Sequence, residues 1–231
     1  MKKDIILLTV ALLIALCPIA VLAQEEEEYN FADHTMLVAA IEQEWRTQNL
    51  YTAYNDGRPD IRAYFLGFAQ AYPNELLNYM VNKMIGIDSD ESGGPFVLDR
   101  KNGYIGGEWW AQLSLGVQMC YWHTTDGNVI IAVAFKGHEY KDGIPACDSD
   151  EDSDDDFIVN ISGLMFYKVI GDQLLWRPIT PERMLGRSFD FKHYDIDLPR
   201  SGKDIILTGN EPGDGNYTLR WTGTGFTVVK K

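Results

Sequence analysis

Residues 88–99 carry oxygen-bearing side chains at the spacing of a calcium-binding loop. In such a loop the oxygen ligands alternate along the chain, a glycine allows a sharp turn, and a carboxylate closes the loop. The sequence places Gly93 at the turn position. The candidate calcium ligands are Asp88, Asp90, Ser92 and Asp99. Pro95 and the short closing carboxylate favour an alternative, a polar loop between a helix and a strand.

A second acidic segment, residues 148–156, contains seven carboxylates in nine positions. Aspartates at alternate positions can converge on one cation, but this segment has no glycine that would fold the backbone around an ion. A solvated loop, extended by repulsion between like charges, is the interpretation that we favour over cation binding.

The four histidines and three cysteines form no His-x₃-His or Cys-x₂-Cys pair, so the sequence does not predict a zinc site. Cys120 and His123 lie near the end of one predicted strand, and His138 follows the next. A cysteine–histidine nucleophile pair would require His138 to approach Cys120 across the hairpin. No oxyanion hole or orienting group is recognisable, and we assign no catalytic residue.

Aromatic side chains are abundant, with 6 Trp, 12 Tyr and 10 Phe. Trp109 and Trp110 are adjacent in a predicted strand, so their side chains point to opposite faces and one of them can be exposed. An exposed ring flanked by carboxylates can stack on a sugar ring; aromatic packing in a β-rich core is the alternative. The candidate ligand-binding residues are Trp109, Trp110, Trp122, His123 and His138.

The elements that must position these residues change type along the chain. Apolar residues recur at helical spacing in three segments within residues 33–86. The expected helix ends are the N-caps Asp33, Asp60 and Asn74 and the C-terminal Gly86. The spacing therefore predicts three N-terminal helices.

From Pro95 onward the apolar period changes to two, which is typical of strands. Tight hairpin turns are predicted at Asn102-Gly103, Asp126-Gly127 and Gly171-Asp172. Strands do not alternate regularly with helices, so a parallel sheet is not expected. The predicted fold class is α+β, with the three helices packed on an antiparallel β-meander sheet.

The first 23 residues have the composition of an export signal. Lys2 and Lys3 precede an uncharged apolar run of about a dozen residues, shorter than the roughly 20 that a spanning helix needs. Retention as an anchor and lipid attachment at Cys17 are the alternatives. We expect an exported protein, periplasmic or extracellular, with no transmembrane segment after cleavage. The expected organisation is a signal peptide at 1–23, an acidic leader at 24–32 and one domain at 33–231, helical over 33–86 and β-rich over 95–231.

Export would leave two cysteines, Cys120 and Cys147, in an oxidising compartment. A disulfide between them is one interpretation, and two free or buried thiols are the other. The formal net charge is −14, and removal of the signal makes it one unit more negative. Such acidity argues against nucleic acid and anionic membrane as partners, because both would repel the chain.

Two stretches resemble small uncharacterised exported proteins of Gram-negative bacteria. The first is Asn102-Gly103-Tyr104-Ile105 with Met119-Cys120-Tyr121-Trp122, and the second is the C-terminal stretch from Leu198 to Phe226. The resemblance covers residues 96–231 and implies a helix-plus-meander fold. It implies no established activity and no catalytic residue.

Three functions follow as hypotheses. The first is a non-catalytic binding or interaction module with a glycan, peptide or envelope partner. The second is a hydrolase of an extracellular polymer, which would need two carboxylates such as Glu108 and Asp126 on either side of a cleft. The third is a structural protein stabilised by calcium; no other cofactor is expected.

Overall fold

The computed structural model describes residues 49–52, 59–87, 93–110, 114–140, 158–170 and 175–231. The chain divides into two units, residues 1–30 and 31–231, and every described residue belongs to the second. The predicted signal peptide, acidic leader and first helix lie outside the described residues. So do Asp88, Asp90, Ser92, Cys147, the acidic segment 148–156 and the turn at Gly171-Asp172.

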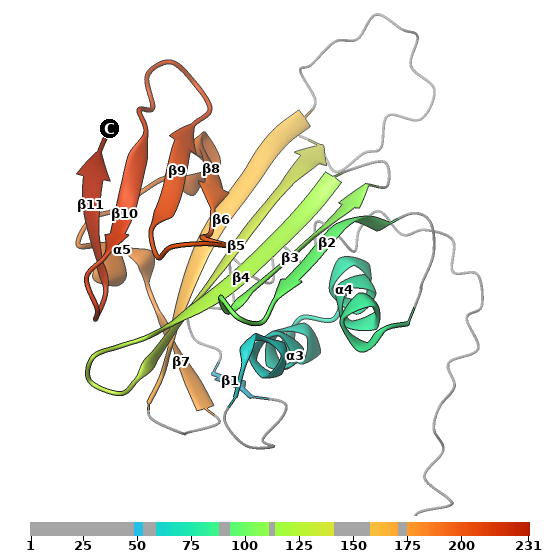
Figure 1. Ribbon diagram of the computed structural model, residues 1–231. Helices are drawn as coiled ribbons and strands as arrows, with labels where there is room; N and C mark the ends of the chain where they lie inside the picture. Colours follow the sequence, from blue (N-terminus) through green and yellow to red (C-terminus); the bar gives the residue numbers. More distant parts are fainter. Residues whose placement is uncertain (1–48, 53–58, 88–92, 111–113, 141–157, 171–174) are drawn as a thin grey trace, which may run out of the picture. The chain divides into compact units, whose positions relative to one another are not determined.

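An antiparallel sheet of seven strands forms the centre of the fold, in the order β1-β7-β6-β5-β4-β3-β2 (Figure 1). The strands are β1 (Leu50–Tyr51), β2 (Gly93–Asp99), β3 (Tyr104–Trp110), β4 (Ser114–His123), β5 (Val129–Tyr140), β6 (Ile158–Val169) and β7 (Leu175–Ile179). From β2 to β7 each strand pairs with its neighbour in the sequence, which confirms the predicted antiparallel meander. The short β1 was not predicted; it pairs with β7 at one edge.

The C-terminal strands form a second antiparallel sheet, in the order β11-β10-β9-β8. They are β8 (Tyr194–Asp197), β9 (Ile205–Gly209), β10 (Tyr217–Trp221) and β11 (Phe226–Lys230). A short helix, α5 (Pro181–Leu185), and a 3₁₀ turn, η1 (Phe191–His193), connect the two sheets. The α+β class with antiparallel pairing is therefore confirmed, but the strands divide between two sheets.

Two helices, α3 (Ile61–Ala71) and α4 (Glu75–Ile85), lie on one face of the seven-stranded sheet (Figure 1). The Asp60 carboxylate accepts a hydrogen bond from the backbone of Arg62 at 3.0 Å, and the Asn74 side chain accepts one from Leu77 at 2.8 Å. Gly86 ends α4 with φ of 81°, a left-handed conformation that glycine adopts readily. These ends agree with the predicted second and third helices.

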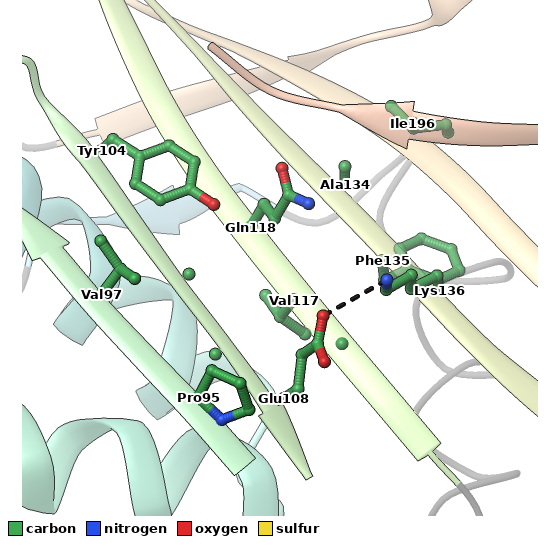
Figure 2. Close-up of a pocket in the computed structure, with 13 residues that line it drawn as sticks. Pro95, Val97, Tyr104, Glu108, Val117, Gln118, Ala134, Phe135, Lys136 and Ile196 are labelled. Carbon is green, nitrogen blue, oxygen red and sulfur yellow. Dashed lines mark ion pairs between the residues drawn. The ribbon is translucent and has the colours of Figure 1, made fainter. Parts of the chain in front are cut away.

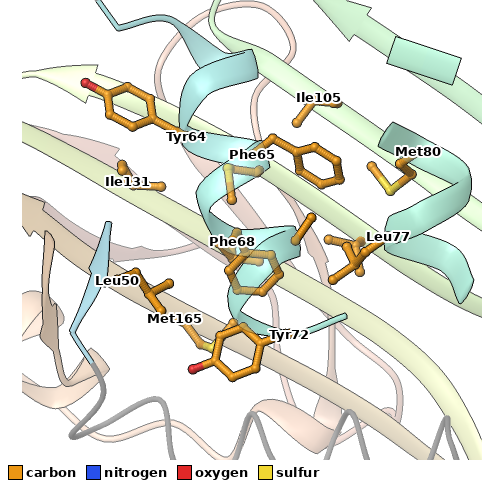
Figure 3. Close-up of a cluster of buried hydrophobic side chains, with 14 of the residues drawn as sticks. Leu50, Tyr64, Phe65, Phe68, Tyr72, Leu77, Met80, Ile105, Ile131 and Met165 are labelled. Atoms are coloured by element: carbon orange, nitrogen blue, oxygen red, sulfur yellow. The ribbon is translucent and has the colours of Figure 1, made fainter. Parts of the chain in front are cut away.

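The helix-side core lies between these two helices and the seven-stranded sheet (Figure 3). Phe65 and Phe68 of α3 and Met80 of α4 are fully buried there, beside Ile131 of β5. Trp176 of β7 is also fully buried in this core.

The opposite face of the central strands packs on the four-stranded sheet. Along β4, side chains alternate between Met119 on the helix side and Cys120 and Trp122 on the side of the small sheet. All seven residues from Val129 to Phe135 of β5 are buried. These strands are apolar on both faces because each face contacts a different layer.

Candidate functional site

Of the five ligand-binding residues predicted from the sequence, Trp122 and His123 are neighbours at the end of β4. Trp122 is 5% exposed and stacks on Trp221, with ring centroids 5.6 Å apart. It therefore presents no open ring face for a sugar. His123 is exposed, and its ring forms a T-shaped contact with the Tyr121 ring, with centroids 5.4 Å apart.

The other three predicted ligand-binding residues lie elsewhere. Trp109 is partly buried against the helix-side core, and the centroid of its ring lies 5.5 Å from that of Tyr79. Trp110 pairs with Ser114 in the ladder of β3 and β4, and His138 pairs with Asn160 in that of β5 and β6. The structure does not describe the side chains of Trp110 and His138.

The strand register keeps His138 away from Cys120. Cys120 pairs with Ala132 of β5, and His138 is six residues further along that strand. At about 3.3 Å per residue, this separation is roughly 20 Å. Cys120 and His138 therefore do not form the cysteine–histidine nucleophile pair.

Glu108 and Asp126, the candidate hydrolase carboxylates, lie near opposite ends of β4. Glu108 pairs with Gly116 in the ladder, whereas Asp126 stands in the turn that follows His123. The seven-residue step from Gly116 to His123 is roughly 23 Å. Each carboxylate is bound to a lysine: Glu108 to Lys136 at 3.3 Å and Asp126 to Lys168 at 3.8 Å. The two carboxylates do not flank a common cleft.

Asp99, the last residue of the proposed calcium loop, ends β2, and the turn glycine Gly93 begins that strand. The extended backbone between them spans roughly 20 Å, which does not let both ends of this segment surround one ion. The Asp99 carboxylate instead accepts hydrogen bonds from the backbone and side chain of Asn102, at 3.1 and 2.9 Å. Those bonds lower its pKa. In the part of the chain that the structure describes, no three His, Cys, Asp or Glu residues are grouped to hold a metal.

Cys120 is a free thiol in the structure, so the disulfide with Cys147 is not found. Its side chain faces the core under the small sheet and is 2% exposed. Burial raises the pKa of this thiol well above its ordinary value, because a thiolate would lose its hydration. Cys120 is therefore a packing residue.

We expect the Cys120 thiol to be unreactive toward iodoacetamide in the native protein and reactive after unfolding in urea. Peptide mapping by mass spectrometry measures the label on the Cys120 peptide separately from labels on other cysteines. Labelling of this peptide under native conditions, or a peptide that links it to Cys147, would contradict the buried free thiol.

A pocket of about 290 Å³ lies beside the end of β4, and we call it the strand-end pocket. Three segments that are distant in the sequence form its walls: the β2–β3 turn at 101–103, the end of β4 at 120–123, and the β8–β9 connection at 199–203. Its volume is close to the lower limit of pockets that bind small molecules.

Specific contacts fix the three walls. Gly103 has φ of 68° and lies against the ring of Tyr121, where an added Cβ would be 2.7 Å from a ring carbon. The Trp122 indole N–H donates to the carbonyl oxygen of Lys203 at 3.0 Å. Arg200 approaches the Asp99 carboxylate at 3.9 Å, so the third wall is also linked to the first. The pocket is thus built by packing and hydrogen bonds.

The strand-end pocket is positively charged in a chain whose net charge is −14. Lys101 and Lys203 line it, both are exposed, and neither has an ion-pair partner among the described residues. His123 also lines the pocket and adds an imidazole ring to it. The nearby Asp99 carboxylate is already engaged by Asn102 and Arg200. Two ammonium groups beside an aromatic wall suit an anionic group on a partly apolar ligand.

Neither Lys101 nor Lys203 was predicted from the sequence as a binding residue. A signal was present, since each lysine lies within two residues of a turn glycine in a strongly acidic chain. Their closeness in space could not be inferred, because it depends on how the second sheet packs on the first.

Comparison with protein-family models, curated proteins and solved structures gave no match. The resemblance to exported proteins of Gram-negative bacteria therefore stays a prediction. Over the described part of the chain, no helix has the length and apolar character needed to cross a bilayer.

Proposed function

We propose that this protein is an exported, non-catalytic binding module that holds a carboxylate group of its ligand in the strand-end pocket. The observation that carries the proposal is a pair of exposed lysines, Lys101 and Lys203, on two different walls of one pocket, with no carboxylate partner among the described residues. A carboxylate is the anion that acidic glycans and peptide C-termini share.

The charge of the whole chain limits the kind of ligand. A polyanion would be repelled by the acidic surface, whereas a ligand with one charge interacts mainly with groups within a Debye length of about 8–10 Å. The favoured ligand is therefore a single acidic sugar residue or a peptide C-terminus. The walls formed by Tyr121 and Pro199 would contact its carbon skeleton.

Titration followed by NMR of backbone amides tests the proposal. Glucuronate and an acetylated dipeptide with a free C-terminus are the two probes, and the methyl ester of the first and the amide of the second are their neutral counterparts. We expect saturable shifts at Lys101, Asn102, Gly103 and Lys203 with the acids and none there with the neutral forms. The acid that binds more tightly shows whether the natural ligand is an acidic sugar or a peptide C-terminus.

Replacement of both lysines, Lys101→Gln with Lys203→Gln, is expected to weaken binding of the better acid roughly tenfold. Each exposed ion pair contributes up to about 1 kcal/mol, and the affinity should also fall as salt is added. Lys231→Gln, at the exposed C-terminus, is the matched control for loss of charge. Equal binding of acids and neutral forms, or an unchanged affinity in the double variant, would refute the carboxylate site.

A further inference from the structure

A second pocket, of about 90 Å³, lies on the side of the seven-stranded sheet that faces β8 (Figure 2). We call it the sheet-face pocket. Residues of β2, β3, β4 and β5 line it, and Ile196 of β8 borders it. It has room for several water molecules or for one edge of a sugar ring.

Two glycines allow other side chains to lie flat on the sheet surface here. A Cβ at Gly106 would be 2.5 Å from the hydroxyl oxygen of Tyr104, so the phenol lies across this glycine. A Cβ at Gly116 would be 3.1 Å from Cε of Lys136, whose stem lies across the second glycine. The absence of side chains at these two positions keeps the pocket open.

Tyr104 and Gln118 present polar groups to this pocket, and Figure 2 shows the Tyr104 hydroxyl directed toward Gln118. The Gln118 amide oxygen accepts a hydrogen bond from the backbone N–H of Leu198 at 2.9 Å. This bond fixes the amide orientation and leaves its NH₂ group as a donor without a protein partner among the described residues. Burial raises the pKa of Tyr104 to about 12, so the hydroxyl stays protonated at neutral pH.

The charged groups of the pocket balance each other. Glu108 of β3 and Lys136 of β5 form an ion pair at 3.3 Å across β4 (Figure 2). Val97, Ala134 and Ile196 add apolar surface. Oriented donors and acceptors beside apolar surface, without net charge, suit a neutral ligand that carries several hydroxyl groups.

We propose that the sheet-face pocket is a second binding site, which takes the hydroxyl-bearing edge of a neutral sugar. Tyr104 and the Gln118 amide donate hydrogen bonds to sugar oxygens, and the Glu108 carboxylate accepts from a hydroxyl. The apolar residues contact the C–H groups of the ring. This site uses none of the residues of the carboxylate site, so each proposal can fail without the other.

Titration of the full chain with neutral monosaccharides, followed by NMR of backbone amides, tests this site. The panel comprises glucose, galactose and mannose, which differ in the configuration of single hydroxyl groups. We expect at least one sugar to give saturable shifts at Gly106, Gly116 and Gln118. No saturable shift at these amides with any of the three sugars would overturn the proposal.

Two variants separate binding from folding. Tyr104→Phe removes one hydroxyl, and Gln118→Glu keeps the acceptor for Leu198 but loses the NH₂ donor. We expect each to weaken sugar binding by about three- to tenfold, the effect of one net hydrogen bond. Tyr51→Phe changes an exposed tyrosine on β1 and should leave the affinity unchanged. A Tyr104→Phe protein with native amide shifts and unchanged affinity would also overturn the proposal.

Discussion

Trp176→Ala is expected to lower the free energy of unfolding by about 3–5 kcal/mol, the usual cost of removing a large aromatic side chain from a core. Trp176 is fully buried on β7, and its ring forms T-shaped contacts with the rings of Tyr64 and Tyr167, with centroids 5.9 Å and 5.4 Å away. Its indole N–H donates to the hydroxyl of Thr52 at 3.3 Å. The substitution removes contacts to α3, β6 and the chain beside β1 together.

Urea denaturation followed by circular dichroism measures this loss, with the m-value as a check that the unfolded state is unchanged. Tyr51→Ala is a suitable control, because Tyr51 pairs with β7 but its side chain is 63% exposed. We expect the control to change stability by less than about 0.5 kcal/mol. A Trp176→Ala protein that is destabilised no more than the control would contradict the packing of β7 against α3.

Gly67→Ala is the second substitution for which we expect a large loss of stability, although alanine usually stabilises a helix by about 1 kcal/mol relative to glycine. Gly67 lies in α3, where an added Cβ would overlap the backbone carbonyl oxygen of Tyr51. A backbone atom cannot rotate away as a side chain can, so β1 or α3 must move. We expect a loss of about 1–3 kcal/mol, with the pairing of β1 and β7 weakened first.

Thermal and urea unfolding of Gly67→Ala measure the effect, and hydrogen exchange of the Leu50 and Trp176 amides locates it. Gly213→Ala is the matched control, since a Cβ there meets no atom within 4 Å. The control should differ from the parent protein by less than about 0.5 kcal/mol. An increase in stability on Gly67→Ala would show that α3 does not approach β1 this closely.

Local signals in the sequence were sufficient for the described helices and for much of the strand pattern. Asp60, Asn74 and Gly86 act through hydrogen bonds and backbone angles within a few residues, and such short-range effects can be inferred from the sequence. The position of His138 could also have been predicted. Residues on the two sides of the Asp126-Gly127 turn pair in order along the hairpin, from His123 with Val129 beside the turn to Leu115 with Gly137.

The candidate sites depended on long-range packing that no local pattern encodes. Lys101 and Lys203 are about a hundred positions apart, and they line one pocket only because the second sheet covers part of the first. The predicted role of Trp122 assumed an exposed ring, but the same packing buries it against Trp221. A count of aromatic residues cannot distinguish these two environments.

The register between β5 and β6 has a consequence for how this protein can change in evolution. Tyr140 and Ile158 are direct partners at the end of a twelve-residue ladder, although 17 residues separate them in the sequence. The chain therefore leaves and re-enters the sheet at one point, and each doubling of the number of residues between two such ends costs only about 0.6 kcal/mol of closure entropy. Insertions and deletions between these two residues are open to selection without any change in strand pairing. Relatives of this protein should therefore vary in length between Tyr140 and Ile158 more than in the other strand connections of the sheet.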